Sequence, residues 1–288
     1  MSKGFITIGI DTDKDRIRYC YGLAVSIKIS DNNAQVCLVV DKNKADEVPQ
    51  EYLHAFDYIV ELPFGNTAYK DGFHGMNLWQ LYHCTPFDET IYIDGDTLLH
   101  NIELEDLWEQ LSLNNMSVPY TASTYRNLPT TGAEFEFEDT YELPKLYYNI
   151  MYWKQETQEA IEWFKMADPI MQNWRAVYSQ FFQDKKPDTF DKNILCNITT
   201  HCVDIEDQIK IKMTNHYNLK MKSAGIWGED FPDNWTEALN YWVSDKGKIQ
   251  IENSIISSGI IHYSDENFLT DHCLDVFTTN LTENQIRI

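Results

Sequence analysis

The stretch ETIYIDGDTLLHNIELEDLW, residues 89–108, places two aspartates one residue apart directly after an apolar run. The run TIYI (90–93) has the length and continuous apolar character of a strand buried on both faces. Asp94 and Asp96 follow it, and Gly95 lets the chain bend between them at low steric cost. Two carboxylates at such a bend can face one cation, and oxygen ligands suit Mg²⁺ or Mn²⁺. The alternative is that Asp96 caps a turn and Asp94 is merely solvated.

Strand and helix signals alternate on the N-terminal side of this stretch, which predicts an α/β fold with a mainly parallel, twisted sheet flanked by helices. Ligands of such sheets bind beyond the carboxyl ends of the strands, where Asp41, Asp94 and Asp96 lie. The expected strands are 5–10, 34–40, 57–63 and 90–93, and the expected helices are 19–29 and 75–84.

The second half of the chain is less regular, and we expect a strand at 117–124 followed by an acidic loop or hairpin at 132–145. A strand at 147–153 leads into a helical region, 155–183, which we expect to be interrupted at Asp168-Pro169 because proline disfavours helix in the residue before it. Short strands are expected around 248–253 and 257–264. We predict one domain over 1–288, with a change of character after about residue 116.

The composition describes a folded, acidic protein. Of the 288 residues, 23 are basic and 45 acidic, giving a formal net charge of −22, which disfavours contact with nucleic acid and anionic lipid. Six cysteines without CxxC pairing predict buried, reduced thiols rather than disulfides or a zinc site. No signal-peptide core and no apolar run of membrane-spanning length stand out, so we expect a cytoplasmic protein without a membrane span.

The extended stretch DETIYIDGDTLLHNIELEDLW (88–108) resembles the Asp-x-Asp region of nucleotide-sugar glycosyltransferases with the GT-A fold. The resemblance is to the retaining group that includes glycogenin and bacterial lipopolysaccharide galactosyltransferases. It extends in the same order to FITIGIDTDKDRIRYCYGLAVSIK (5–28), YYNIMYW (147–153) and SSGIIHYS (257–264), and so covers about 260 of the 288 residues. The resemblance implies a nucleotide-sugar-binding half (1–116) and an acceptor-side half (117–288) within the one domain.

The resemblance implies that Asp94, Asp96 and His262 hold Mn²⁺ or Mg²⁺ for a nucleotide-sugar donor, a UDP-sugar being the commonest in the group. It further implies that Asn149 faces the acceptor and that Asp191, in TFDKNILCN (189–197), lies near the anomeric carbon. For Asp191 the alternative is a helix N-cap. The residues that the resemblance places at the nucleotide are Ile8, Gly9, Asp11, Thr12 and, for stacking or phosphate contact, Tyr19.

Two features depart from the family pattern. The predicted helix before the Asp-x-Asp strand, GMNLWQLYHC (75–84), has no basic residue, and HYSDENFLTD (262–271) has no lysine to contact the diphosphate. The leaving phosphate would then depend more on the metal or on basic residues such as Arg16, Lys222 or Lys246.

The function implied is metal-dependent sugar transfer to an acceptor hydroxyl, with retention of configuration, by front-face attack or through a covalent intermediate on Asp191. The acceptor stays open between a saccharide or lipopolysaccharide precursor, a protein side chain and a small molecule. The compact, acidic, aromatic-rich chain also resembles bacteriophage proteins, which suggests a hydroxymethylated DNA base as acceptor in the host cytoplasm. The net charge opposes that reading. The basic residues whose gathering on one face would support it are Lys145, Lys154, Lys165, Arg175, Lys185 and Lys186.

Two other classes of protein remain as alternatives. A nucleotide-sugar-binding module that no longer transfers would explain the two missing basic residues, although Asp94, Asp96 and His262 are all present. A metal-dependent phosphohydrolase would place an aspartate nucleophile after its first strand, which GIDTDKD (9–15) mimics. The order of the later landmarks favours the glycosyltransferase.

Overall fold

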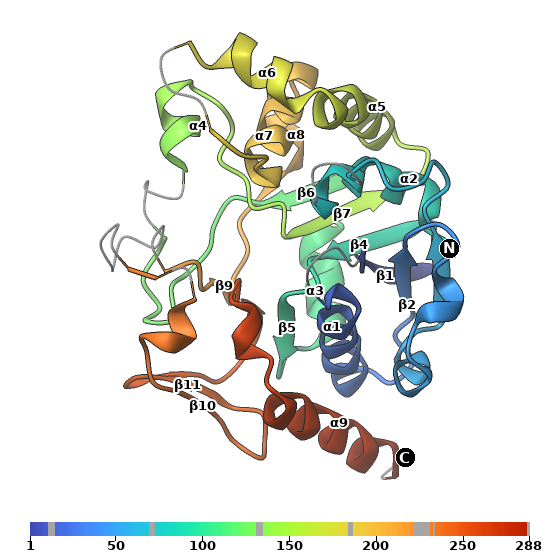
Figure 1. The fold of residues 1–288 in the computed structure, drawn as a ribbon, viewed down its shortest axis with the longest axis vertical. Coiled ribbons are helices and arrows are strands. Elements are labelled where there is room, and N and C mark those ends of the chain that lie inside the picture. The colour runs from blue at the N-terminus through green and yellow to red at the C-terminus, as the bar shows by residue number, and fades with distance from the viewer. Residues whose placement is uncertain are drawn as a thin grey trace.

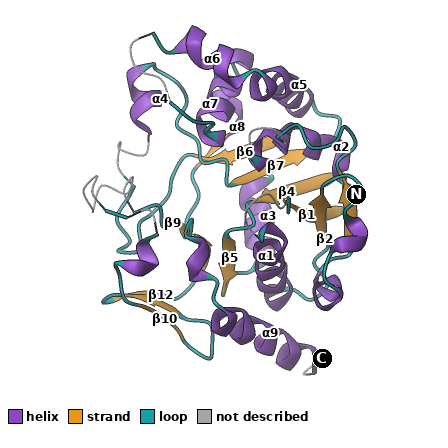
Figure 2. Ribbon diagram, viewed as in Figure 1, coloured by secondary structure: helices purple, strands orange, loops and turns teal. Residues whose placement is uncertain are grey.

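A seven-stranded sheet forms the centre of the computed structural model, which describes residues 1–10, 15–68, 73–130, 135–183, 187–221, 231–232 and 234–286. Its strand order is β3-β2-β1-β4-β7-β6-β8, and helices lie on both sides of it (Figures 1 and 2). The strands are β1 (Lys3–Ile8), β2 (Val36–Val40), β3 (Tyr58–Glu61), β4 (Glu89–Ile93), β6 (Met116–Pro119), β7 (Ile150–Lys154) and β8 (Lys210–Ile211).

The sheet is mainly parallel, as the sequence predicted. Strands β3, β2, β1 and β4 pair in parallel, and β6 and β8 also pair in parallel. Strand β7 runs antiparallel between β4 and β6. The helices are α1 (Arg16–Ser30), α2 (Leu81–Cys84), α3 (Leu104–Leu111), α4 (Glu136–Thr140), α5 (Gln158–Gln172), α6 (Trp174–Phe181), α7 (Lys192–Val203), α8 (Glu206–Ile209) and α9 (Asp271–Ile286).

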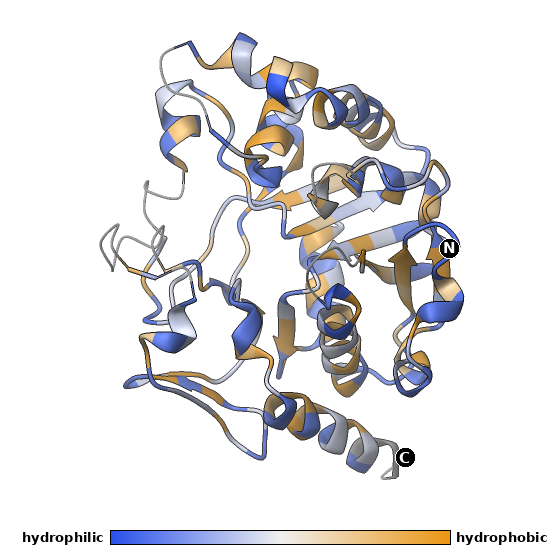
Figure 3. Ribbon diagram, viewed as in Figure 1, coloured by the Kyte–Doolittle hydropathy of each residue, from blue (hydrophilic) through white to orange (hydrophobic). Residues whose placement is uncertain are grey.

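Both faces of the sheet are buried, which explains why its strands are continuously apolar. Phe5 and Ile91 belong to a core with residues of α1, α3 and α9, whereas their neighbours Ile6 and Tyr92 belong to a second core with residues of α5 and α7. This alternation is the two-residue period of a strand. Figure 3 shows hydrophobic colouring along β1 and β2, and all five side chains of β2 are buried.

Two small sheets complete the described fold. One has the order β5-β13-β9 and the other the order β10-β11-β12. Their strands are β5 (Thr97–His100), β9 (His216–Asn218), β10 (Tyr241–Val243), β11 (Ile249–Ile251), β12 (Ser254–Ile256) and β13 (Gly259–His262). Gly259 begins β13 with φ = 145°, and a Cβ there would lie 2.5 Å from the carbonyl oxygen of Asn215, so this position requires glycine.

The acidic segment 132–145, expected as a loop or hairpin, instead contains the short helix α4. Its alternation of phenylalanine and acid suggests a strand, but Phe137 and Tyr141 are four positions apart and both pack against Phe182 after α6. This tertiary contact favours the helical spacing. The strand expected at 117–124 is also shorter, because β6 ends at Pro119. The helix expected at 75–84 is a 3₁₀ helix, His74–Gln80, that continues into α2.

The interruption expected at Asp168-Pro169 is wrong, because α5 continues through Pro169 to Gln172. Pro169 lies on the exposed side of the helix, one turn before its end. The break falls at Asn173, whose backbone and side-chain nitrogens both donate to the Pro169 carbonyl, at 3.1 and 2.8 Å. The burial of the opposite face of α5 therefore outweighs the local preference of Asp168-Pro169 against helix.

All six cysteines are free and five of them are buried, which confirms the prediction of thiols rather than disulfides. Among the described residues, no helix combines the length and the apolar character needed to cross a bilayer.

Candidate active site

The turn between β4 and β5 consists of Asp94, Gly95 and Asp96, at the carboxyl end of β4. Gly95 is needed here for a reason that the sequence did not reveal. A Cβ on Gly95 would lie 2.9 Å from Sγ and 3.3 Å from the backbone nitrogen of Cys20 in α1. Close approach of α1, rather than the bend itself, therefore excludes a side chain between the two aspartates.

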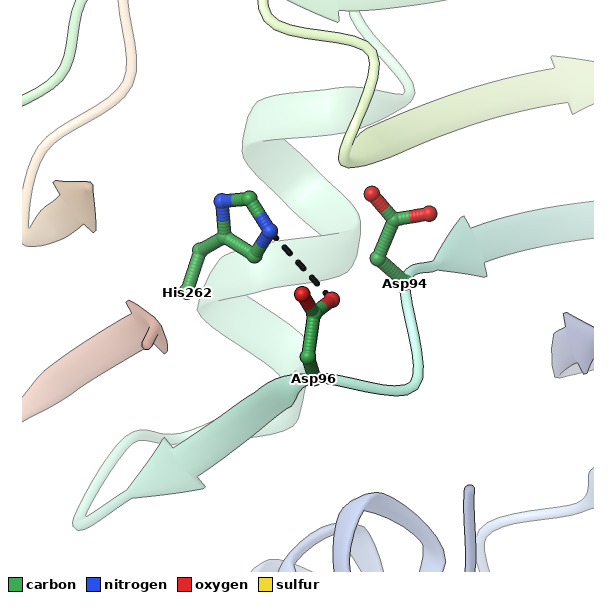
Figure 4. A group of neighbouring side chains, drawn as sticks. All are labelled: Asp94, Asp96 and His262. Carbon is green, nitrogen blue, oxygen red and sulfur yellow. Dashed lines mark ion pairs between the residues drawn. The ribbon is translucent and has the colours of Figure 1, made fainter. Parts of the chain in front are cut away.

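Strand pairing brings His262 to this turn from a distant part of the chain. Strand β13 runs antiparallel to β5 with His262 opposite Thr97, and the Tyr263 nitrogen donates to the Asp96 carbonyl at 3.0 Å. Nε2 of His262 lies 3.2 Å from Oδ1 of Asp96, and both side chains point toward Asp94 (Figure 4). One ligand atom from each of the three residues lies within 4.8 Å of the others.

A second strand pairing brings Asn149 to the same turn. Strand β7 runs antiparallel to β4 with Ile150 opposite Ile93, and the Asp94 nitrogen donates to the Asn149 carbonyl at 2.9 Å. The side chain of Asn149 is 5% exposed, and its Nδ2 lies 3.0 Å from Nε2 of His216.

Lys192 was not singled out from the sequence, yet its ammonium group contacts both carboxylate oxygens of Asp94. The Tyr92 hydroxyl donates to the same carboxylate, and the Lys192 ammonium lies 5.4 Å from the centre of the Tyr92 ring. Lys192 is the first residue of α7, where the helix dipole disfavours a positive charge. A lysine at this unfavourable position is the one local signal that could have marked it.

Asp191 precedes Lys192 and caps α7, since its Oδ1 accepts a hydrogen bond from the Ile194 nitrogen at 3.1 Å. The alternative reading of Asp191 as an N-cap is therefore present in the structure. The residue also lines the pocket described below, so its predicted place near the reacting carbon stays a prediction.

Burial opposes ionisation at this site, but the opposite charges outweigh it. Desolvation raises the pKa of Asp96, but His262, Lys192 and Arg16 lower it by more. The net pKa of Asp96 therefore lies well below its usual value. Burial lowers the pKa of His262, while Asp96 and Asp94 raise it, and the net shift is upward. Asp96 is thus an ionised carboxylate in a partly desolvated position.

A pocket of about 460 Å³ opens over the Asp94–Asp96 turn. Its volume lies in the range typical of small-molecule sites. Its lining carries three carboxylates, three cationic side chains, the imidazole of His262 and the aromatic side chains of Tyr19, Phe73, Tyr147 and Phe190. The carboxylates are those of Asp94, Asp96 and Asp191, and the cationic side chains are those of Arg16, Lys192 and Lys220.

Most of the predicted site residues meet in this pocket. Ile8, Tyr19, Asn149, Asp191 and His262 line it together with the Asp94–Asp96 turn. Burial is the main cause that raises the pKa of Tyr19 to about 12, so its hydroxyl is a neutral hydrogen-bonding group. Arg16, one of the three proposed substitutes for the missing basic residues, also lines it.

Other predicted residues lie elsewhere. Gly9 is buried behind the pocket, with its nitrogen bonded to the Val39 carbonyl at 2.8 Å, and is not part of the lining. Asp11, Thr12 and Lys222 lie outside the described residues, as does Asp13 of the phosphohydrolase-like stretch. Two further residues are also absent from the lining: Lys246 and Asp41.

The donor set fits a hard divalent cation. Two carboxylates and one imidazole within 4.8 Å of one another supply ligand types that Mn²⁺ accepts readily, and the ionised Asp96 needs no deprotonation at neutral pH. The Lys192 ammonium is a built-in competitor, because it already occupies both oxygens of Asp94. These residues can therefore hold a cation once Lys192 gives up part of its contact with Asp94.

Because His216 is buried beside the pocket, we expect the protein to lose stability in acid. Burial lowers the pKa of His216 from 6.5 to about 4; the hydrogen bond to Thr121 opposes this shift, and His262 adds to it. Between about pH 6.5 and pH 4 the unfolded chain binds a proton that the folded chain excludes. The free energy of unfolding should therefore fall as pH decreases through this window, by about 3 kcal/mol in total.

Urea unfolding of the wild type and of His216→Gln, at several pH values from 7 to 4, tests this expectation. The variant should lose stability in acid less steeply than the wild type. Parallel curves for the two proteins would show that His216 titrates normally in the folded state.

Comparisons with known proteins agree with this architecture at the level of fold. No protein-family model and no curated protein matches the sequence. Among solved structures, the galactosyltransferase LgtC in complex with donor and acceptor sugar analogues is similar with a TM-score of 0.54 and 11% identity, over 97% of this chain and 95% of that one.

Two further glycosyltransferases of known structure are similar over almost the whole of this chain. GlyE of Streptococcus pneumoniae TIGR4 has a TM-score of 0.51 and 13% identity, over 98% of this chain and 62% of that one. The bifunctional glycosyltransferase WbbM has a TM-score of 0.51 and 12% identity, over 97% of this chain and 49% of that one. This chain thus spans less than two thirds of the length of these two proteins.

The fold is that of the GT-A glycosyltransferases: a mixed α/β architecture with a central, mostly parallel sheet flanked by helices. Identities of 11–13% establish this fold and leave the chemistry to be argued from the site itself.

Proposed function

We propose that this protein is a metal-dependent glycosyltransferase that moves a sugar from a nucleoside-diphosphate sugar, most simply a UDP-sugar, to an acceptor hydroxyl with retention of configuration. The observation that carries the proposal is the meeting of Asp94, Asp96 and His262 at the carboxyl end of β4, inside a pocket of about 460 Å³. Two segments far apart in the sequence, the turn between β4 and β5 and the end of β13, meet there.

Asp94, Asp96 and His262 are the residues that would hold the metal. A divalent cation at this place supplies positive charge for the diphosphate as the bond to the sugar breaks. The lining alone carries as many carboxylates as cationic groups, three of each, so it offers little net attraction to an anionic donor. With Mn²⁺ or Mg²⁺ held by Asp94, Asp96 and His262, this balance would favour the donor.

The cationic residues of the pocket take the place of the two basic positions that the sequence lacks. Arg16 lies at the start of α1, Lys192 at the start of α7 and Lys220 just after β9. We assign them to the diphosphate, where fixed positive charges stabilise the developing negative charge. Their presence favours a transferring enzyme over a module that only binds nucleotide sugar.

On the acceptor side, we place Asn149 and Asp191 against the reacting sugar, because both line the pocket beside the proposed metal ligands. Their role is to position the acceptor hydroxyl next to the anomeric carbon, and such positioning supplies much of the rate. Since the structure of LgtC holds donor and acceptor sugar analogues, we propose a saccharide acceptor here as well.

A DNA acceptor and a phage origin rest on the sequence alone. The described basic residues whose gathering on one face would support a DNA acceptor belong to four elements: Lys145 follows α4, Lys154 ends β7, Lys165 is in α5 and Arg175 is in α6. Lys145 is also paired with Asp139. Lys185 and Lys186 lie outside the described residues.

A thermal-shift screen of nucleotide sugars, with Mn²⁺, with Mg²⁺ and with EDTA, tests the proposal. One donor should raise the melting temperature only when a divalent cation is present, because Asp94, Asp96 and His262 would hold the cation that supplies positive charge for the diphosphate. A stabilisation of about 2–3 kcal/mol is expected at a donor concentration about 100-fold above its dissociation constant. That donor is then incubated with candidate saccharides, and the products are analysed by mass spectrometry. Stabilisation that survives EDTA, or no stabilisation by any donor, would contradict the proposal.

A further inference from the structure

His216 joins Asn149 to a neighbouring loop through both of its ring nitrogens. Its Nδ1 lies 3.0 Å from the carbonyl oxygen of Thr121, and its Nε2 lies 3.0 Å from Nδ2 of Asn149. The residue is only 1% exposed. The ring of Tyr147 stands edge-on to the imidazole, with the ring centres 5.6 Å apart. His216 therefore has a fixed place directly behind a pocket-lining amide.

The partner of Nδ1 determines which nitrogen of His216 carries the proton. A backbone carbonyl only accepts hydrogen bonds, so Nδ1 must be protonated to make this contact. Burial lowers the pKa of His216 to about 4, and at neutral pH the ring therefore carries one proton only. Nε2 is consequently a hydrogen-bond acceptor, and its partner on Asn149 must be the amide nitrogen, which donates.

The backbone of Asn149 is held in place, and this limits how its side-chain amide can be oriented. Its carbonyl accepts from the Asp94 nitrogen at 2.9 Å, which fixes Asn149 to the turn that holds both aspartates. Rotation of the terminal amide would exchange the oxygen and the nitrogen at nearly equal volume. Among the described residues, the hydrogen bond to Nε2 of His216 is the side-chain contact of Asn149 that distinguishes the two orientations.

We propose that His216 is a positioning residue that holds the carbonyl oxygen of Asn149 toward the pocket, where this oxygen accepts a hydrogen bond from a hydroxyl group of the bound sugar. His216 itself does not contact substrate. The contact with sugar rests on the proposed function. The tautomer of His216 and the orientation of the amide do not rest on it, because they follow from hydrogen bonds inside the protein.

The orientation of the Asn149 amide determines which kind of substrate group it can bind. With its oxygen toward the pocket, Asn149 requires a group that donates a hydrogen bond, and with its nitrogen toward the pocket it would require an acceptor. Replacing His216 by leucine removes the group that distinguishes the two states. Replacing it by glutamine supplies a side-chain oxygen that can accept from Asn149 in place of Nε2.

The first test needs no substrate. Side-chain nitrogen NMR of the protein labelled at histidine should show His216 as a neutral ring protonated at Nδ1 at pH 7. The Asn149 side-chain amide should show a hydrogen-bonded proton in the wild type that is lost in His216→Leu. A ring protonated at Nε2, or a charged ring, would overturn the proposal whether or not the protein transfers sugar.

The second test uses the donor and acceptor found by the screen above. His216→Leu should lower kcat/KM by about tenfold, the usual effect of one lost hydrogen bond. His216→Gln should recover most of this loss. Stabilisation by Mn²⁺ and the free nucleoside diphosphate, which carries no sugar, should be the same in all three proteins.

His100→Leu is the matched control, because His100 is also buried, at the end of β5, but does not line the pocket. It should change the melting temperature and leave kcat/KM per folded molecule unchanged. Equal kcat/KM losses in His216→Leu and His216→Gln would show that His216 supports the fold only.

Discussion

Asp96→Asn should bind Mn²⁺ at least about a hundredfold more weakly than the wild type, since even outer partners of metal ligands contribute 10–100-fold. Asparagine has nearly the same volume, so the turn between β4 and β5 can keep its shape while the ligand charge is lost. Sugar transfer should fall by at least about a hundredfold, because the charge on the leaving diphosphate is no longer balanced. Calorimetric titration with Mn²⁺ and the transfer rate at saturating donor measure the two effects.

Asp41→Asn is the control for this variant. Asp41 also follows a strand of the large sheet, β2, but its carboxylate serves a local turn, where it accepts from the Lys42 nitrogen at 2.7 Å and from Asn66 at 3.3 Å. It should bind Mn²⁺ and transfer sugar as the wild type does. If Asp96→Asn keeps wild-type Mn²⁺ affinity, the assignment of the metal site is wrong.

Lys192→Met should bind Mn²⁺ more tightly than the wild type and yet transfer sugar more slowly. The ammonium group contacts both oxygens of Asp94, and removing it frees this carboxylate for the metal. The same change removes a fixed positive charge from the diphosphate. We expect roughly a tenfold gain in Mn²⁺ affinity and roughly a tenfold or greater loss in kcat, since close charge pairs in partly buried sites contribute a few kcal/mol.

Misfolding would weaken both Mn²⁺ binding and sugar transfer. A gain in Mn²⁺ affinity together with a loss in kcat therefore distinguishes the predicted effect from misfolding. Lys220→Met gives the comparison: Lys220 lines the same pocket from the segment after β9, and its loss should reduce donor binding without raising Mn²⁺ affinity. Weaker Mn²⁺ binding in Lys192→Met would mean that Lys192 supports the ligand set instead of competing with it.

The sequence was most informative where local pattern and tertiary role coincide. The apolar strand before Asp94 is buried on both faces, so its continuous hydrophobicity predicted both the strand and the parallel sheet. The expected convergence of Asp94, Asp96 and His262 is also present in the structure. That convergence could not be read from spacing alone. It came from the resemblance to GT-A enzymes, because the pairing of β5 with β13 leaves no local signal.

What the sequence missed depends on long-range contacts. Lys192 contacts Asp94, which is 98 positions away in the sequence, and the residues next to Lys192 in the sequence do not indicate this contact. Helix α4 was missed because Phe137 and Tyr141 pack against Phe182, and this contact outweighs the strand-like alternation of their segment. His216 appeared as one histidine among eight, because its neutral state depends on burial and on a carbonyl 95 positions away.

The proposed metal ligands belong to two different sheets. Asp94 directly follows β4 of the large sheet, whereas His262 ends β13 of a three-stranded sheet that holds β13 between β5 and β9. The two sheets pack into one hydrophobic core, which contains Ile91 of β4 and Ile260 of β13. A cation held by Asp94 on one side and His262 on the other would add a cross-link whose strength depends on the free concentration of the metal. The availability of metal would then set how firmly the two sheets are joined, and hence how readily the three-stranded sheet opens locally.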